Sequence, residues 1–167
     1  MEVSVHQAAK QLGEPVPYAW TGSVPAQSYG GGQLSFLGEA ALQGTITGEK
    51  DAFRITGEAS LVLDTRCARC NEPVQQPITF SFEERFLRAG MITPEDDAYP
   101  FQGDTVDLEQ AFMDNLFLNL PMVSLCRPDC KGLCPVCGTN LNRSRCSCAD
   151  QPQKSAFDAL KALSFEK

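Results

Sequence analysis

Eight cysteines are the residues of this chain whose type and spacing point most directly to chemistry. Six of them lie between Cys126 and Cys148, and the other two, Cys67 and Cys70, form a C-x-x-C pair far upstream. A cysteine thiolate is a soft anionic ligand, and four thiolates arranged tetrahedrally complete a closed structural zinc site. The cysteines therefore predict metal binding, and they divide into two sets of four with none left over.

The first set of four cysteines is local. Cys134 and Cys137 are separated by two residues, so that one tight turn can aim both sulfurs inward. Gly138 comes next and can adopt the positive φ at which a side chain would clash. Cys146 and Cys148 follow after an eight-residue loop. We expect these four cysteines to bind one zinc ion.

The second set joins distant parts of the chain. Cys126 and Cys130 need partners from elsewhere, and Cys67 and Cys70 are the remaining cysteines. We expect these four to bind a second zinc ion and to fix the cysteine-rich segment to the rest of the protein. A redox-active C-x-x-C pair at Cys67 and Cys70 is an alternative. Such a pair is usually followed by a helix, which Pro73 disfavours here.

Disulfides or ordinary buried thiols are the alternative for all eight cysteines. Disulfide scaffolds are typical of short secreted chains, whereas residues 1–11 lack the basic segment and apolar run of a signal peptide. The chain also has no apolar run long enough to span a membrane. We therefore expect a cytoplasmic protein that has no membrane partner.

No catalytic residue is predicted. The chain has no phosphate-binding glycine loop, no nucleophile elbow and no H-E-x-x-H motif. A site of four cysteines leaves no open coordination position for a catalytic metal, and His6, the sole histidine, lies in no motif. We expect neither an enzyme nor a small-molecule substrate.

The net charge of −7 argues against a protein that coats nucleic acid by electrostatics alone. Basic residues nevertheless gather within a few positions of the cysteines, and they are Arg66, Arg69, Arg127, Lys131, Arg143 and Arg145. Two interpretations are open and compatible. The cations can offset the negative charge of a four-thiolate centre, or they can form a small face for phosphate groups. All six are therefore candidate contacts for RNA or for a protein partner.

Apolar residues alternate with others through much of residues 33–87, and this period of two predicts strands with one buried face. Turn-forming residues at 48–51 and 71–73 separate three such strands, so we expect an antiparallel meander or a partly closed barrel. Cys67 and Cys70 would then lie at the tip of the hairpin between the second and third strands.

A helix is predicted from Asp107 to Leu120, because Asp107 and Gln110 match a capping box and apolar residues recur at helical spacing up to Pro121. We expect this helix to cover the sheet and to lead Cys126 toward the hairpin tip. The predicted fold class is α+β, with a β-rich body at 1–120 that includes one packing helix, a zinc-binding module at 121–150, and a short C-terminal helix within 151–167.

The remaining segments are predicted with simpler roles. Residues 2–5 suit a short strand, and residues 6–12 suit one or two helical turns. Residues 15–32 contain three prolines and four glycines and indicate a long loop around Trp20. Residues 89–103 indicate a solvated acidic loop that carries Glu95, Asp96 and Asp97.

The cysteine-rich segment contains a specific run of residues: Leu120-Pro121, Cys126, Cys130-Lys-Gly-Leu-Cys134-Pro, Cys137-Gly138, Asn140-Leu-Asn142 and Cys146-x-Cys148. This run resembles the YceD family, bacterial and plastid proteins tied to the accumulation of 23S ribosomal RNA. The upstream Cys67-x-x-Cys70 pair, the helix start at Asp107 and the segment from Phe157 to Leu163 also fit. The resemblance implies a role in the maturation or persistence of large-subunit ribosomal RNA, and the family offers no established reaction.

Our leading hypothesis is a non-enzymatic ribosome-biogenesis factor. A zinc-stabilised surface would contact precursor ribosomal RNA or a large-subunit ribosomal protein. One alternative is a protein-interaction adaptor that recruits a basic protein through its acidic surface without touching RNA. Another is a zinc-linked thiol redox sensor, in which oxidation releases metal and unfolds the module.

Overall fold

The structure is a computed structural model, and it describes residues 1–30, 32–93 and 95–150. Its elements, in chain order, are β1 (Glu2–Ser4), α1 (His6–Lys10), β2 (Pro15–Gly22), β3 (Gln27–Tyr29), β4 (Gly32–Glu49), β5 (Ala52–Arg66), β6 (Pro73–Arg88), β7 (Tyr99–Phe101), β8 (Thr105–Asp107), α2 (Glu109–Leu118) and a short 3₁₀ turn, η1 (Ser147–Asp150). The predicted C-terminal helix within 151–167 lies outside the described residues.

Three long antiparallel strands, β4, β5 and β6, form the middle of the main sheet, so the predicted meander is confirmed. The strand order is β2-β4-β5-β6-β7, and β3 pairs with β4 outside that path. In the described part of the chain the sheet is not closed, because β2 and β7 stand at its two ends. The alternative of a partly closed barrel was therefore wrong. Pro15 and Pro17 suit this result, since proline cannot donate to a further strand.

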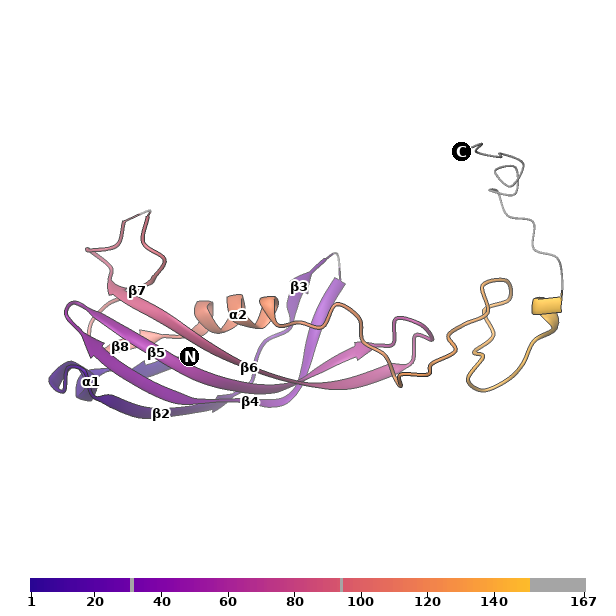
Figure 1. Ribbon diagram of the computed structural model, residues 1–167, viewed down its shortest axis with the longest axis horizontal. Coiled ribbons are helices and arrows are strands. Elements are labelled where there is room, and N and C mark those ends of the chain that lie inside the picture. The colour runs from indigo at the N-terminus through magenta and orange to yellow at the C-terminus, as the bar shows by residue number, and fades with distance from the viewer. Residues whose placement is uncertain (31, 94, 151–167) are drawn as a thin grey trace, which may run out of the picture.

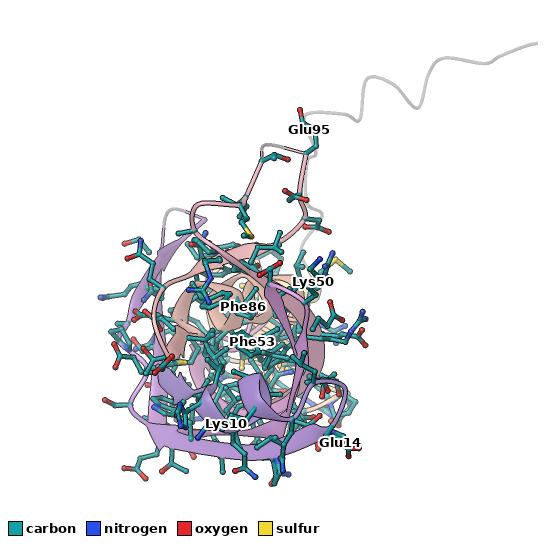
Figure 2. The ribbon with its side chains drawn as sticks, turned by 90° about the vertical axis from the view of Figure 1, so that its left-hand side faces the viewer. Lys10, Glu14, Lys50, Phe53, Phe86 and Glu95 are labelled. Atoms are coloured by element: carbon teal, nitrogen blue, oxygen red, sulfur yellow. The ribbon has the colours of Figure 1, made fainter. Side chains whose placement is uncertain are left out.

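The hydrophobic core lies along the inner face of the curved sheet. Ile55, Ala59 and Leu61 of β5 are buried at alternate positions, as a strand with one buried face requires. Figure 2 looks along the molecule from the α1 end and shows Phe53 and Phe86 inside the curve of the sheet.

Helix α2 packs on this core. Its Phe112 is fully buried, with its ring centroid 5.7 Å from that of Phe80 in β6. The helix begins at Glu109, whose backbone N–H donates to the Asp107 carboxylate at 3.0 Å, and ends before Pro121. It meets the sheet chiefly at β6, which is less than the cover of the sheet that the sequence predicted (Figure 1).

The prediction of a long loop at residues 15–32 was wrong, because β2 and β3 lie there. Prolines interrupt most strands, but an edge strand tolerates them where the missing N–H faces away from its neighbour. Trp20 of β2 is half-buried and packs against the core. A Cβ at Gly22 would come within 2.5 Å of the Trp20 ring, so this glycine makes room for the indole.

The predicted loop at residues 89–103 contains strand β7, which pairs with β6 in parallel. Phe101 of β7 is buried against Phe53, with ring centroids 5.0 Å apart. The acidic run itself is exposed, as predicted, and Asp96 accepts hydrogen bonds from the backbone N–H and hydroxyl of Thr93. Figure 2 shows Glu95 on the projecting part of this loop.

A second, two-stranded sheet pairs β1 with β8 and thereby joins the start of the chain to the segment before α2. Within the described ranges, neither helix has the length and apolar character that a bilayer crossing requires.

Candidate metal centres

The first C-x-x-C pair forms the tip of the β5–β6 hairpin, as predicted. The backbone N–H of Asn71 donates to the carbonyl of Cys67 at 2.8 Å, and the N–H of Cys67 donates to the carbonyl of Glu72 at 2.8 Å. Asn71 closes this tight turn with a φ of 59°, a conformation that asparagine tolerates better than most residues. The turn places the sulfurs of Cys67 and Cys70 on one side of the hairpin.

The second C-x-x-C pair repeats this turn. The N–H of Gly138 donates to the carbonyl of Cys134 at 2.9 Å, and the N–H of Cys134 donates to the carbonyl of Thr139 at 2.8 Å. Gly138 has a φ of 72°, as the sequence predicted. Two separate segments thus adopt one hydrogen-bonded loop that carries two cysteines.

The four distributed cysteines come together as predicted, and we call this quartet the clasp site. Its members are Cys67, Cys70, Cys126 and Cys130, whose sulfurs all lie within 4.8 Å of one another. The chain around Cys126 and Cys130 reaches the hairpin tip through two hydrogen bonds. The Ala68 N–H donates to the carbonyl of Ser124 at 2.9 Å, and the Arg69 guanidinium donates to the carbonyl of Cys130 at 2.9 Å.

The four local cysteines also come together, and we call this quartet the knuckle site. Its members are Cys134, Cys137, Cys146 and Cys148, again with all sulfurs within 4.8 Å of one another. The two quartets differ in exposure. Three of the four cysteines of the clasp site are buried, whereas the knuckle site has one buried, one exposed and two half-buried cysteines.

The distances between sulfurs distinguish a metal site from a disulfide. Four sulfurs about 2.3 Å from a central zinc ion in a tetrahedron lie about 3.8 Å from one another. In the clasp site Cys67 and Cys130 are 3.7 Å apart, and Cys70 and Cys126 are 3.6 Å apart. A disulfide would require about 2.05 Å. All eight cysteines are free thiols in this structure, and their arrangement fits a tetrahedral metal ion.

Local hydrogen bonds favour the thiolate form that binds metal. The backbone N–H of Cys126, followed by those of Cys70 and Arg69, lowers the pKa of the Cys67 thiol to about 6 against the effect of burial. The hydroxyl and backbone N–H of Thr139 lower the pKa of Cys137 to about 6. Burial raises the pKa of Cys126 to about 12, and the hydrogen bond with Cys137 raises the pKa of Cys148 to about 12. Each site therefore contains both a cysteine that readily loses its proton and a cysteine that retains it.

Asn140 and Asn142 are the site residues that sequence reasoning did not assign. The Asn142 side-chain amide donates to the sulfur of Cys130 at 3.3 Å, and that of Asn140 donates to Glu72 at 3.1 Å. Both asparagines lie between the cysteine pairs of the knuckle site. Their position between two pairs of candidate ligands could have marked them as part of the site, but sequence spacing does not show which ligand a side chain reaches.

The six basic residues divide into two groups. Three hold the module together: Arg69 donates to Cys130, Arg127 donates to Asn142 at 2.7 Å, and Arg143 pairs with Glu72 at 2.7 Å. Arg66 is exposed and donates to the carbonyl of Asn71 at 3.1 Å. The side chains of Lys131 and Arg145 are exposed and make no ion pair or hydrogen bond within residues 1–30, 32–93 and 95–150.

The cysteine-bearing segment lies beyond the β5–β6 hairpin tip, at the end of the molecule opposite α1 (Figure 1). The clasp site brings sulfurs of this segment within 4.8 Å of those at the hairpin tip, and each quartet offers four sulfurs, the number that a closed structural metal site requires.

The sequence is similar to those of several known proteins. The chain is 37% identical over 91 residues to an uncharacterized protein of Mycobacterium tuberculosis, with 52% of this chain and 44% of that protein covered. It is 27% identical over 135 residues to a chloroplastic protein of Zea mays named large ribosomal RNA subunit accumulation protein YCED homolog 1, with 62% of this chain and 46% of that protein covered. The chain thus spans less than half the length of these relatives. No solved structure matches it significantly.

The family model described as large ribosomal RNA subunit accumulation protein YceD matches residues 55–164. The match begins in β5 and includes all eight cysteines. It covers well over half of the chain, so this protein belongs to the YceD family.

Proposed function

We propose that this protein is a non-enzymatic factor for the accumulation of large-subunit ribosomal RNA, and that two zinc ions hold its RNA- or protein-binding module in place. The observation that supports this most directly is that the eight cysteine sulfurs come together in two separate groups of four, beyond the end of the sheet. Tetrahedral four-sulfur sites in proteins hold zinc or iron, and paired C-x-x-C turns are typical of structural zinc. When bound, zinc would cross-link the segments that carry its ligands.

The binding surface is proposed from three exposed cations near the quartets. Lys131 and Arg145 have no side-chain partner within the described residues, and Arg66 donates to the carbonyl of Asn71. Lys131 lies in the chain between the two quartets, Arg145 lies next to Cys146, and Arg66 lies next to Cys67. All three side chains are exposed. The net charge of −7 disfavours broad contact with a phosphate backbone, so a local set of cations is the arrangement that suits RNA.

The family description supports the pathway, since it concerns accumulation of large-subunit ribosomal RNA. Within that pathway we propose precursor ribosomal RNA, or a large-subunit ribosomal protein bound to it, as the partner. An adaptor that recruits a basic protein without touching RNA is the second candidate, and the exposed acidic loop that carries Glu95 and Asp97 favours it.

Charge reversal separates these candidates. Lys131→Glu combined with Arg145→Glu should lower 23S ribosomal RNA in cells that depend on this protein, without changing metal content. The matched control is Lys10→Glu combined with Lys50→Glu, which makes the same charge change at the opposite end of the molecule (Figure 2). RNA crosslinks that disappear in the first variant and persist in the control support RNA contact. Normal 23S ribosomal RNA in the first variant would refute the proposed surface, and crosslinks to protein alone through residues 95–97 would favour the adaptor.

A further inference from the structure

Asn142 belongs to the loop of the knuckle site, yet its side chain contacts the clasp site. Cys137 precedes the loop and Cys146 follows it, and their sulfurs lie within 4.8 Å of each other. The Asn142 Nδ2 group donates to the sulfur of Cys130, a clasp-site ligand, at 3.3 Å. A residue in the loop of one quartet therefore makes a hydrogen bond to a cysteine of the other.

The hydrogen-bond partners of Asn142 fix the orientation of its amide. Its Oδ1 accepts from the backbone N–H of Lys131 at 2.8 Å and from the Arg127 guanidinium at 2.7 Å. Both of these groups can only donate, so the oxygen must face them. The NH₂ group then faces Cys130 and the Asn140 oxygen, at 3.3 and 2.9 Å. All four hydrogen-bonding positions of the amide are used, and any other rotamer would lose several of them.

The surrounding loop positions Asn142 against the clasp site. The N–H of Leu141 donates to the carbonyl of Gly132 at 2.9 Å, and Asn140 donates to Glu72 at the hairpin tip. The loop between Cys137 and Cys146 must be ordered for these bonds to form, and ordering a backbone costs conformational entropy at every residue. A metal ion that draws Cys137 and Cys146 together would cover part of that cost before Asn142 reaches Cys130.

We propose that Asn142 is a positioning residue that couples metal binding at the two sites. Metal at the knuckle site holds the Asn142 amide against Cys130, and the amide stabilises the Cys130 thiolate as a ligand of the clasp site. Because coupling between two binding equilibria is reciprocal, metal at the clasp site strengthens binding at the knuckle site by the same factor. Outer-shell hydrogen bonds to metal ligands change affinity by about 10–100-fold, which sets the expected size of the effect. The inference rests on the metal binding proposed above.

The test uses cadmium-113 as the probe, since cadmium binds four-thiolate sites and reports each site as its own resonance. The full chain is loaded with cadmium and titrated with EDTA while both resonances are followed. Four variants are compared with the unmodified chain. They are Asn142→Asp, Cys137→Ser, the combination of these two, and Asn142→Gln. Asn119→Asp is the matched control, because it makes the same change from amide to carboxylate at an exposed position outside the module.

Coupling through Asn142 predicts that Asn142→Asp and Cys137→Ser each weaken cadmium binding at the clasp site by about 10–100-fold. Cys137 is not a clasp-site ligand, so its effect there measures the coupling. The combined variant should lose no more than either single variant, and Asn142→Gln, which keeps the amide, should lose less than Asn142→Asp. The control should bind cadmium like the unmodified chain.

The proposal is overturned if Cys137→Ser leaves the clasp-site affinity unchanged, or if the two single effects multiply in the combined variant. Equal losses in Asn142→Asp and Asn142→Gln would also overturn it, because the amide would then have no role. In each of these outcomes the unmodified chain still binds two cadmium ions, so the proposed function stands. A chain that binds no cadmium would instead refute the metal sites themselves.

Discussion

Gly132 offers a sharp test of how the clasp site is built. This glycine lies between Cys130 and Cys134, and its φ of 75° lies in the left-handed region. A Cβ there would also lie 3.1 Å from the carbonyl oxygen of Arg69, a backbone atom of the hairpin tip that cannot rotate away. Gly132→Ala therefore combines a conformational cost with a crowded contact between the two segments that carry the clasp-site ligands.

The conformational part of this cost is about 1–2 kcal/mol, the usual penalty for a side chain in the left-handed region. Since 1.36 kcal/mol corresponds to a factor of ten, metal affinity at the clasp site should fall by at least about 5–30-fold. The contact with Arg69 adds to this value. The assay is EDTA titration of the cadmium-loaded protein, with the two sites followed separately by their resonances.

Two other glycines act as controls for Gly132→Ala. Gly138→Ala has a similar φ of 72° with open space around the added Cβ, so it should show the conformational cost alone and chiefly at the knuckle site. Gly13→Ala, with a φ of 82° near α1, should destabilise the body without weakening either metal site. If Gly13→Ala releases metal as readily as Gly132→Ala, metal retention follows global stability and the local reasoning is refuted.

Three further predictions test the core and the sites. Phe112→Ala should lower the free energy of unfolding, measured in urea, by about 3–5 kcal/mol, because Phe112 is fully buried. Leu118 is 84% exposed, so Leu118→Ala should change this free energy by about 0.5 kcal/mol or less, and equal effects would contradict the core assignment. Acid should release the metal below about pH 6, because protons must displace the metal from its thiolates, and the lowered pKa values of about 6 keep Cys67 and Cys137 deprotonated above that pH even without metal. Metal content after gel filtration is the measurement, and retention of all metal at about pH 4 would count against this. Mild hydrogen peroxide should release metal from the knuckle site before the clasp site, since a disulfide needs two accessible sulfurs and Cys126 alone is exposed among the clasp ligands. Simultaneous loss of both cadmium resonances would contradict this order.

Sequence periodicity predicted the three long strands because each buries one face against a common core, and alternation records that directly. The grouping of the cysteines into two quartets was also predictable, since eight cysteines in closely spaced pairs leave few ways to form two tetrahedral sites. The edge strand β2 was missed because proline usually interrupts a strand, so that Pro15 and Pro17 indicated a loop. The sequence does not show that β2 has a free edge, where proline is tolerated. Strands β7 and β8 have three residues each, and their pairing is decided by contacts with distant segments.

Within the site, the sequence predicted a turn at residues 71–73 but not the left-handed conformation of Asn71, and it did not reveal the role of Asn142. Asn71 occupies the left-handed position that glycine takes in the other C-x-x-C turn, and asparagine gives a weaker signal for it. The role of Asn142 depends on a loop that folds back onto a different quartet. Side-chain hydrogen bonds across a loop of this kind depend on three-dimensional placement, which spacing along the chain does not encode.

Metal content tests the central claim most directly. The full chain should be purified without added metal or chelator, and its zinc and iron should be measured by mass spectrometry against protein concentration. The two quartets predict about two zinc ions per chain and no stoichiometric iron. One zinc ion per chain would leave one quartet as ordinary thiols, and a folded protein without metal would contradict the account of the module altogether.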